Sequence, residues 1–151
     1  MGRSSDAQPV VLLWGLTLGA TVIASVVWGH KTPLRLAAGV PVLAAGVLLA
    51  VVAWGFLGSG GGGLVTRGPY ACSRHPFYIG LLLMLTGTVL SLGSVIGAAM
   101  LVLSAGASAL RAAIEEKDLA QRFGEEYREY RARTPFLVGL PQHGGKGRTR
   151  R

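Results

Sequence analysis

The stretch FYIGLLLMLTGTVLSLGSVIGAAMLVLSAGASAL, from Phe77 to Leu110, decides the fold of this 151-residue chain. Its 34 residues include no charged side chain. As one α-helix it would be about 51 Å long at about 1.5 Å per residue, whereas a bilayer core of about 30 Å needs only about 20 residues. The segment Ser91–Ser94 offers a turn near the middle. The run therefore predicts a hairpin of two helices that both cross a membrane.

Two further apolar runs precede this hairpin. One covers the 19 uncharged residues from Val10 to Trp28, and the other lies between Arg35 and Arg67, also without a charge. Small residues in the second run, such as Gly39 and Gly46, suit close helix packing in lipid. Half of the residues are hydrophobic and the mean hydropathy is +0.47. We therefore predict an all-α integral membrane bundle of about four transmembrane helices, forming a single domain over residues 1–140.

The charges predict how the bundle is oriented. The net charge is +8, and ten of the Lys and Arg residues follow Leu110. Four crossings place this basic part, Arg67 and Arg74 on one side of the membrane, with both termini cytoplasmic. A three-helix alternative would place the basic part outside. We expect an inner or plasma membrane protein whose basic end contacts membrane lipids. Nucleic acid is not an expected partner, because no reader motif accompanies the charge.

The residues that follow Leu110 are rich in charge, unlike the apolar runs before them. Between Arg111 and Arg133 apolar residues recur near the helical period with charges between them, which predicts a cytoplasmic amphipathic helix ended by Pro135. Residues 141–151 are expected to form a disordered basic tail. A single cysteine, Cys72, excludes an internal disulfide and provides no metal pair, so no metal site is expected.

Polar side chains gather at two places that flank the hairpin. The first, Leu64–Gly80, reads LVTRGPYACSRHPFYIG, and the second lies between Arg111 and Glu116. Polar groups at a membrane boundary are costly unless something binds there. In a hairpin both clusters return to the same membrane face, so we predict that they form one site. The competing interpretation is an interfacial aromatic belt with a simple surface ion pair.

Within this site the residue types favour particular ligand groups. Pro76 forces His75 out of helical geometry, which leaves His75 and Tyr78 near a helix N-terminus that favours an anionic group. Arg111 and Glu115, at i and i+4, share a helix face. An ammonium group suits Glu115 and a carboxylate suits Arg111, whereas Glu116 points about 100° away.

The glycine run from Gly58 to Gly63 literally matches the dinucleotide-binding pattern G-x-G-x-x-G. That pattern needs a preceding strand and a following helix, and here a transmembrane helix precedes it. We interpret the run as a flexible connector.

The ordered set of motifs resembles a known family. L-V-T-x-G-P-Y from Leu64, R-H-P-x-Y-x-G from Arg74, the Glu115–Glu116 pair and F-G-x-E-Y from Phe123 are similar to the isoprenylcysteine carboxyl methyltransferase family and its prokaryotic relatives. Phospholipid methyltransferases share much of the pattern. The resemblance covers roughly the C-terminal half of the chain.

This resemblance implies a membrane methyltransferase that uses S-adenosylmethionine. It implies that Glu115 holds this donor and that Arg111 faces the methyl acceptor. The acceptor would be a lipophilic small molecule or a lipidated substrate, with an isoprenylcysteine-like carboxylate as the first expectation. A phospholipid amine and a small thiol stay open as alternatives. The remaining donor-lining positions that the resemblance implies are Gly62, Gly63, Leu64, Val65, Tyr70, Arg74, His75, Pro76, Phe77 and Tyr78.

A different class of protein is the competing hypothesis. A small four-helix transporter or an accessory membrane subunit would have the same apolar runs. A proton- or cation-coupled carrier usually needs an ionisable group near the bilayer midplane. All charges here flank the apolar runs, which favours the enzyme.

Overall fold

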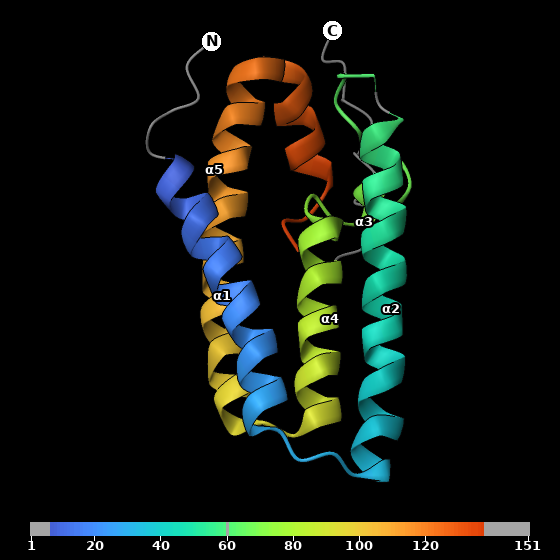
Figure 1. Cartoon of the computed structure of the whole chain (residues 1–151). Coiled ribbons are helices and arrows are strands. Elements are labelled where there is room, and N and C mark those ends of the chain that lie inside the picture. Colours follow the sequence, from blue (N-terminus) through green and yellow to red (C-terminus); the bar gives the residue numbers. More distant parts are fainter. Residues whose placement is uncertain (1–6, 60, 138–151) are drawn as a thin grey trace, which may run out of the picture.

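The computed structural model describes residues 7–59 and 61–137. Within them the chain forms four long helices and one short helix. Their bounds are Ala7–Trp28 (α1), Pro33–Gly58 (α2), Pro69–Cys72 (α3), Pro76–Leu92 (α4) and Val95–Arg133 (α5). Helices α1, α2, α4 and the first part of α5 run alternately down and up beside one another (Figure 1). The prediction of an all-α bundle with a central hairpin is confirmed.

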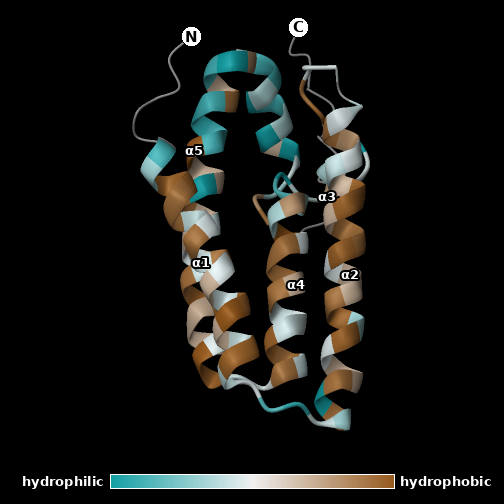
Figure 2. Ribbon diagram, in the orientation of Figure 1, coloured by the Kyte–Doolittle hydropathy of each residue, from teal (hydrophilic) through white to brown (hydrophobic). Residues whose placement is uncertain are grey.

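The lengths and surfaces of the helices suit a bilayer. Among the described residues, three helices are long and apolar enough to cross a membrane, namely α1 from Gln8, α2 and α5. The fourth, α4, is apolar but shorter at 17 residues, or about 25 Å. Apolar residues cover the long shafts, whereas hydrophilic residues gather at the ends of the bundle (Figure 2). Large side chains that face outward, such as Leu16 and Val102, are 71% exposed, as expected of surfaces in contact with lipid.

Helices α2 and α4 approach closely because glycines face the contact. A Cβ atom added to Gly46 would lie 2.5 Å from the backbone nitrogen of Met84, and one added to Gly80 would lie 2.7 Å from that of Ala50. Real Cβ atoms do not come so near backbone atoms. Small residues at such contacts allow helices to pack tightly in lipid, as expected from the sequence of the second apolar run.

Helices α1 and α5 pack through small polar groups instead. The Trp14 indole N–H donates to the Ser108 hydroxyl at 3.0 Å, and the hydroxyls of Thr21 and Ser104 are hydrogen-bonded at 2.9 Å. Thr21 and Ser104 are fully buried. Inside a membrane such bonds satisfy groups that lipid cannot. They also fix the position of Trp14 relative to α5.

The hairpin turns where the sequence predicts it. Gly93 caps α4 in the left-handed conformation with φ of 63° and donates to the carbonyl of Val89 at 2.7 Å. Ser94 then caps α5 by accepting a hydrogen bond from the backbone of Gly97 at 2.9 Å. Glycine adopts positive φ without strain, so Gly93 and Ser94 end one helix and begin the next.

The amphipathic helix expected between Arg111 and Arg133 is not continuous. Gly124 interrupts α5 with φ of 54° and ψ of −117°, a conformation that glycine adopts readily and that strains other residues. After this break the chain turns over and descends toward α3 and the start of α4 (Figure 1). We call residues 125–137 the return segment. The predicted tail over residues 141–151 lies outside the described residues.

Candidate active site

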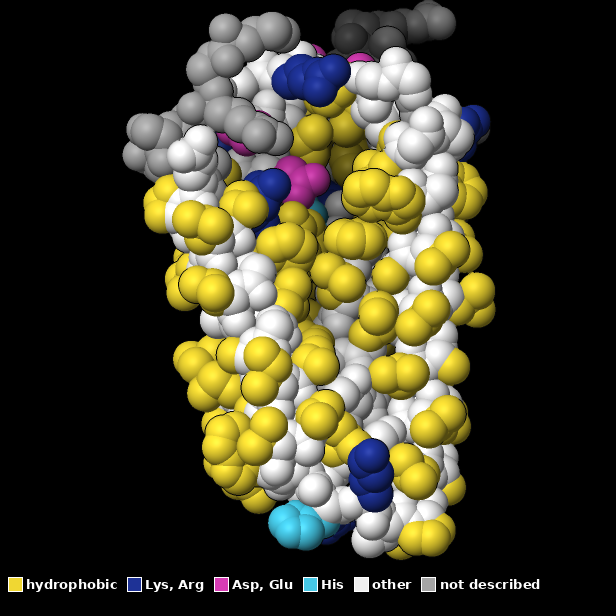
Figure 3. Space-filling model, in the orientation of Figure 1, with side chains coloured by type: hydrophobic (Ala, Val, Ile, Leu, Met, Phe, Trp, Pro, Cys, Tyr) yellow, Lys and Arg dark blue, Asp and Glu magenta, His cyan; other side chains and the backbone are white. Residues whose placement is uncertain are grey.

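A cavity of about 260 Å³ lies near one end of the bundle, and all five helices contribute to its wall. The view of one face in Figure 3 shows a hollow in the same half, where acidic and basic side chains are surrounded by apolar ones. The residues that line the cavity are Trp14, Trp54, Leu57, Tyr70, His75, Phe77, Tyr78, Arg111 and Glu115.

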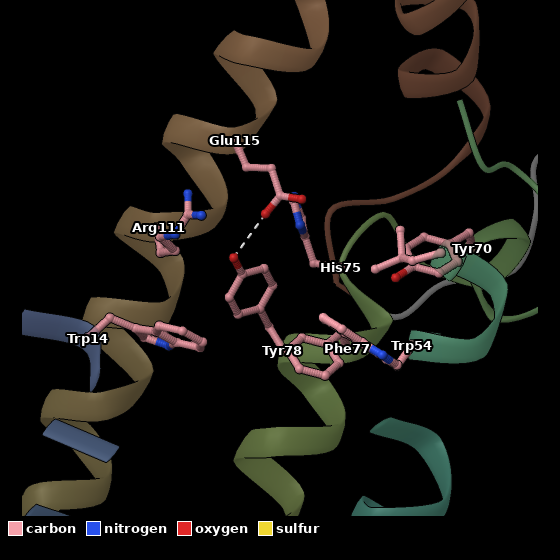
Figure 4. A pocket seen from close by; sticks show the side chains of 9 residues that line it. Trp14, Trp54, Tyr70, His75, Phe77, Tyr78, Arg111 and Glu115 are labelled. Atoms are coloured by element: carbon pink, nitrogen blue, oxygen red, sulfur yellow. Dashed lines mark hydrogen bonds between the residues drawn. The ribbon is translucent and has the colours of Figure 1, made fainter. Parts of the chain in front are cut away.

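The two predicted polar clusters meet across this cavity. The hydroxyl of Tyr78, on the first turn of α4, donates to a carboxylate oxygen of Glu115 on α5 at 2.9 Å. Arg111 lies one turn before Glu115 on the same side of α5 (Figure 4). The sequence separation of Tyr78 and Glu115 is 37 residues, so the hairpin is what brings them together.

Aromatic rings surround this hydrogen bond. The ring of Trp14 packs edge-on to that of Tyr78 with 5.6 Å between centroids, and the rings of Trp54 and Phe77 are tilted at the same separation. Figure 4 shows these rings beside Tyr78 and below Glu115. Aromatic faces attract cations that have left water. The cavity thus combines a carboxylate with several ring surfaces, a combination that suits a positively charged ligand.

His75 lies at the N-cap of α4 and is only 4% exposed. Burial lowers the pKa of His75 below its ordinary value, although the nearby carboxylates of Glu115 and Glu116 oppose this shift. The imidazole is therefore neutral at pH 7. Its ring packs near those of Tyr78 and Phe136, with centroid separations of 5.7 and 4.9 Å.

The return segment closes over the turn that carries His75. The backbone N–H of Arg74 donates to the carbonyl of Pro135 at 3.1 Å, and the hydroxyl of Tyr130 donates to the carbonyl of Tyr70 at 2.7 Å. The guanidinium of Arg74 lies 5.5 Å from the ring centre of Phe136. Burial also raises the pKa of Tyr70, so this phenol in the cavity wall stays neutral. The return segment therefore fixes one side of the site.

Six of the residues singled out from the sequence line the cavity, and six others do not. Arg74 and Pro76 support the turn from outside the cavity wall. Gly62 and Gly63 are exposed in the loop before α3, where the carbonyl of Gly62 accepts a hydrogen bond from Arg122 at 3.1 Å. Leu64 and Val65 follow in the same loop and are half-buried.

Three lining residues were missed by sequence reasoning. Trp14, Trp54 and Leu57 belong to the first two apolar helices, where aromatic and aliphatic side chains are ordinary lipid-facing groups. The sequence favours Trp14 as an interfacial anchor of the first helix, since its hydrogen bond to Ser108 is formed over 94 residues and leaves no local signal. The sequence also favours Glu115 over Glu116. In the structure the buried carboxylate of Glu116 contacts both Arg74 and His75, and these contacts were not predicted.

Four apolar helices around a charged and aromatic cavity define a helical membrane protein with a cavity near one end. The family model described as phospholipid methyltransferase matches residues 34–126, which is more than half of the chain. The chain belongs to the phospholipid methyltransferase family. The resemblance drawn from the motifs is thus confirmed. The family and the apolar helices both indicate an integral membrane protein. The transporter and accessory-subunit alternatives are not favoured.

One curated relative is similar over half of the chain. Protein-S-isoprenylcysteine O-methyltransferase of Schizosaccharomyces pombe is 39% identical over 79 residues, which are 51% of this chain and 33% of that protein. The match thus spans about a third of the relative's length. No solved structure matches the chain.

Proposed function

We propose that this protein is an S-adenosylmethionine-dependent methyltransferase of the membrane that acts on a lipophilic acceptor. The observation that carries the proposal is the hydrogen bond between Tyr78 and Glu115 at 2.9 Å, because it joins the two polar clusters in one cavity. Membership of the phospholipid methyltransferase family supports the same reaction class.

The residues of the cavity fit this methyl donor, which carries a sulfonium and an ammonium group. Glu115 supplies a carboxylate for the ammonium, and the rings of Trp14 and Tyr78 offer faces to a cation. The cavity volume of about 260 Å³ lies just below the roughly 300–1,000 Å³ of small-molecule sites. Part of the nucleoside would therefore extend past the cavity, toward the loop of Gly62, Gly63, Leu64 and Val65.

When bound, the donor supplies an electrophilic methyl group on sulfur. Arg111 would orient an acceptor carboxylate, which forms the new oxygen–carbon bond as the carbon–sulfur bond breaks. This carboxylate is already ionised at neutral pH, so the residues need only position it and exclude water. An amine or thiol acceptor would first lose a proton, for which His75 or Glu115 is the candidate base. We favour an isoprenylcysteine-like carboxylate, since the similar yeast protein is named for that substrate.

We also propose that the cavity faces the cytoplasm, with both termini on that side of an inner or plasma membrane. The cavity end holds Arg67, Arg74 and Arg111, while Lys31 and Arg35 lie at the opposite end, and cytoplasmic ends are the more basic ones. Exposed Cys72 provides a test. An impermeant thiol reagent should not label it in intact cells, but should label cysteine introduced by Lys31→Cys in a Cys72→Ser background. The reverse pattern would contradict this orientation.

The reaction is tested by incubating the purified protein with donor labelled in the methyl group and with a host membrane extract. We expect label to enter a lipophilic product. A carboxylate acceptor yields an ester that releases labelled methanol in mild base, whereas an N-methyl or S-methyl product resists base. Glu115→Gln should abolish the transfer. The proposal fails if no label is transferred and reconstituted vesicles instead take up a substrate without any response to the donor.

A further inference from the structure

Glu116, which follows Glu115, has a separate set of contacts on a different face of α5. The side chain of Glu116 is 11% exposed, and one carboxylate oxygen lies 2.7 Å from a guanidinium nitrogen of Arg74. The same oxygen lies 3.3 Å from Nε2 of His75. Its second oxygen lies 3.9 Å from the guanidinium of Arg131 in the return segment. Glu116 does not line the cavity.

These contacts determine which nitrogen of His75 carries the proton. A carboxylate can only accept hydrogen bonds, so the contact with Glu116 requires a proton on Nε2. The imidazole is buried, and burial disfavours its charged form. In a neutral imidazole with a proton on Nε2, Nδ1 carries a free lone pair. Arg74 balances the charge of Glu116 at 2.7 Å, so the carboxylate need not be neutralised by a proton from His75.

We propose that Glu116 is a positioning residue that holds His75 as its neutral Nε2-protonated tautomer, with Nδ1 left as an acceptor beside the cavity. The consequence for ligand binding rests on the function proposed above. A protonated His75 would place a positive charge next to a cationic methyl donor, whereas the neutral ring can accept a hydrogen bond from the donor's ammonium group. Glu116 thereby acts on the ligand only through His75.

This arrangement predicts a pH dependence. The pKa of His75 lies below its ordinary value, so donor affinity should be constant near neutral pH and fall as acid protonates the ring. In Glu116→Gln the loss of the negative charge, with Arg74 left unbalanced, should move that acid limb to lower pH. The titratable and charged groups that face His75 and influence its protonation are Glu115, Glu116 and Arg74. Beyond them lie Arg111, Tyr70, Tyr78 and Arg131.

The tautomer can be measured without any ligand. The chain has three histidines, so His30→Asn with His143→Asn leaves His75 as the single imidazole, provided that purification uses a tag without histidine. In detergent at pH 7, long-range ¹H–¹⁵N spectra should show an Nε2-protonated ring. In Glu116→Gln they should show a mixture of tautomers, and Glu129→Gln, which alters an exposed ion pair with Arg133, should retain the original signals.

The outcomes separate this inference from the proposed function. A ring protonated on Nδ1, or a charged ring at pH 7, in the protein with Glu116 intact would overturn the inference, and this result needs no variant of Glu116 to fold. Unchanged spectra and an unchanged acid limb in Glu116→Gln would also overturn it. A protein with the predicted tautomer that fails to bind the donor would instead contradict the proposed function alone.

Discussion

At the scale of single residues, the hydroxyl of Tyr78 is the group whose removal should affect donor binding most specifically. It orients Glu115 through a hydrogen bond of 2.9 Å, and its ring packs edge-on to Trp14. Tyr78→Phe keeps the ring and removes the hydroxyl. We expect donor affinity to fall by about 1 kcal/mol, roughly fivefold, because Glu115 loses its fixed orientation. Isothermal titration calorimetry in detergent measures the change.

A matched control lies on the same helix. The hydroxyl of Thr86 donates to the carbonyl of Leu82 at 2.7 Å, away from the cavity wall, so Thr86→Val removes a hydroxyl of α4 without touching the site. Its donor affinity should equal that of the unaltered protein. Equal affinities for Tyr78→Phe and Thr86→Val would contradict the role given to Tyr78.

Residue types alone predicted part of the cavity wall. Arg111, Glu115, His75 and Tyr78 stand out because charges and rings at a membrane boundary are costly without a partner. Glu116 could not be assigned in the same way. The rotation of about 100° between consecutive helical residues gives the direction of its side chain and does not identify the residues that contact it. Its partner is a turn that precedes the hairpin, 41 residues away, and that contact exists only in the folded chain.

At the scale of helices and turns, Gly124 determines where the return segment lies. Its φ of 54° and ψ of −117° are accessible to glycine and strained for other residues by about 1–3 kcal/mol. Gly124→Ala should therefore lower the melting temperature in detergent. It should also weaken donor binding, because the return segment supports the turn of Arg74 and His75 through Pro135 and Phe136.

Gly106 provides the control for this change. It lies in the regular part of α5, where an added Cβ atom would meet nothing within 4 Å. Alanine is favoured over glycine inside a helix by about 0.5–1 kcal/mol, so Gly106→Ala should leave donor affinity unchanged and should not lower the melting temperature. A Gly124→Ala protein as stable as Gly106→Ala and with full affinity would show that the reversal is not fixed by that glycine.

The sequence predicted the helices themselves well, but it did not predict the change of chain direction at Gly124. Long uncharged runs and the turn at Gly93 and Ser94 follow from bilayer thickness and from capping preferences. The break at Gly124 was missed, since glycine within an amphipathic pattern is tolerated in many helices and the apolar period continues through Phe123 and Tyr127. The conformation of one residue therefore changed the direction of the last thirteen described positions, 125–137.

At the scale of the whole molecule, the bundle brings distant segments to one cavity. Two differently packed helix pairs, α2 with α4 and α1 with α5, place Trp54 and Trp14 on opposite sides of Tyr78. The sequence predicted that the hairpin would unite the flanking clusters. It could not predict that the first two helices complete the cavity wall. In sequence, an aromatic residue that lines a cavity looks the same as one that faces lipid.

The central claim is that the polar clusters on either side of the hairpin hold one methyl donor together. Calorimetric titration of the donor into purified Glu115→Gln, His75→Ala and the exposed control Glu129→Gln tests this most directly. We expect Glu129→Gln to bind like the unaltered protein. The other two should lose about 2–3 kcal/mol, roughly 30- to 150-fold in affinity, while all three insert and purify normally. Unaltered affinity in both Glu115→Gln and His75→Ala would contradict the account.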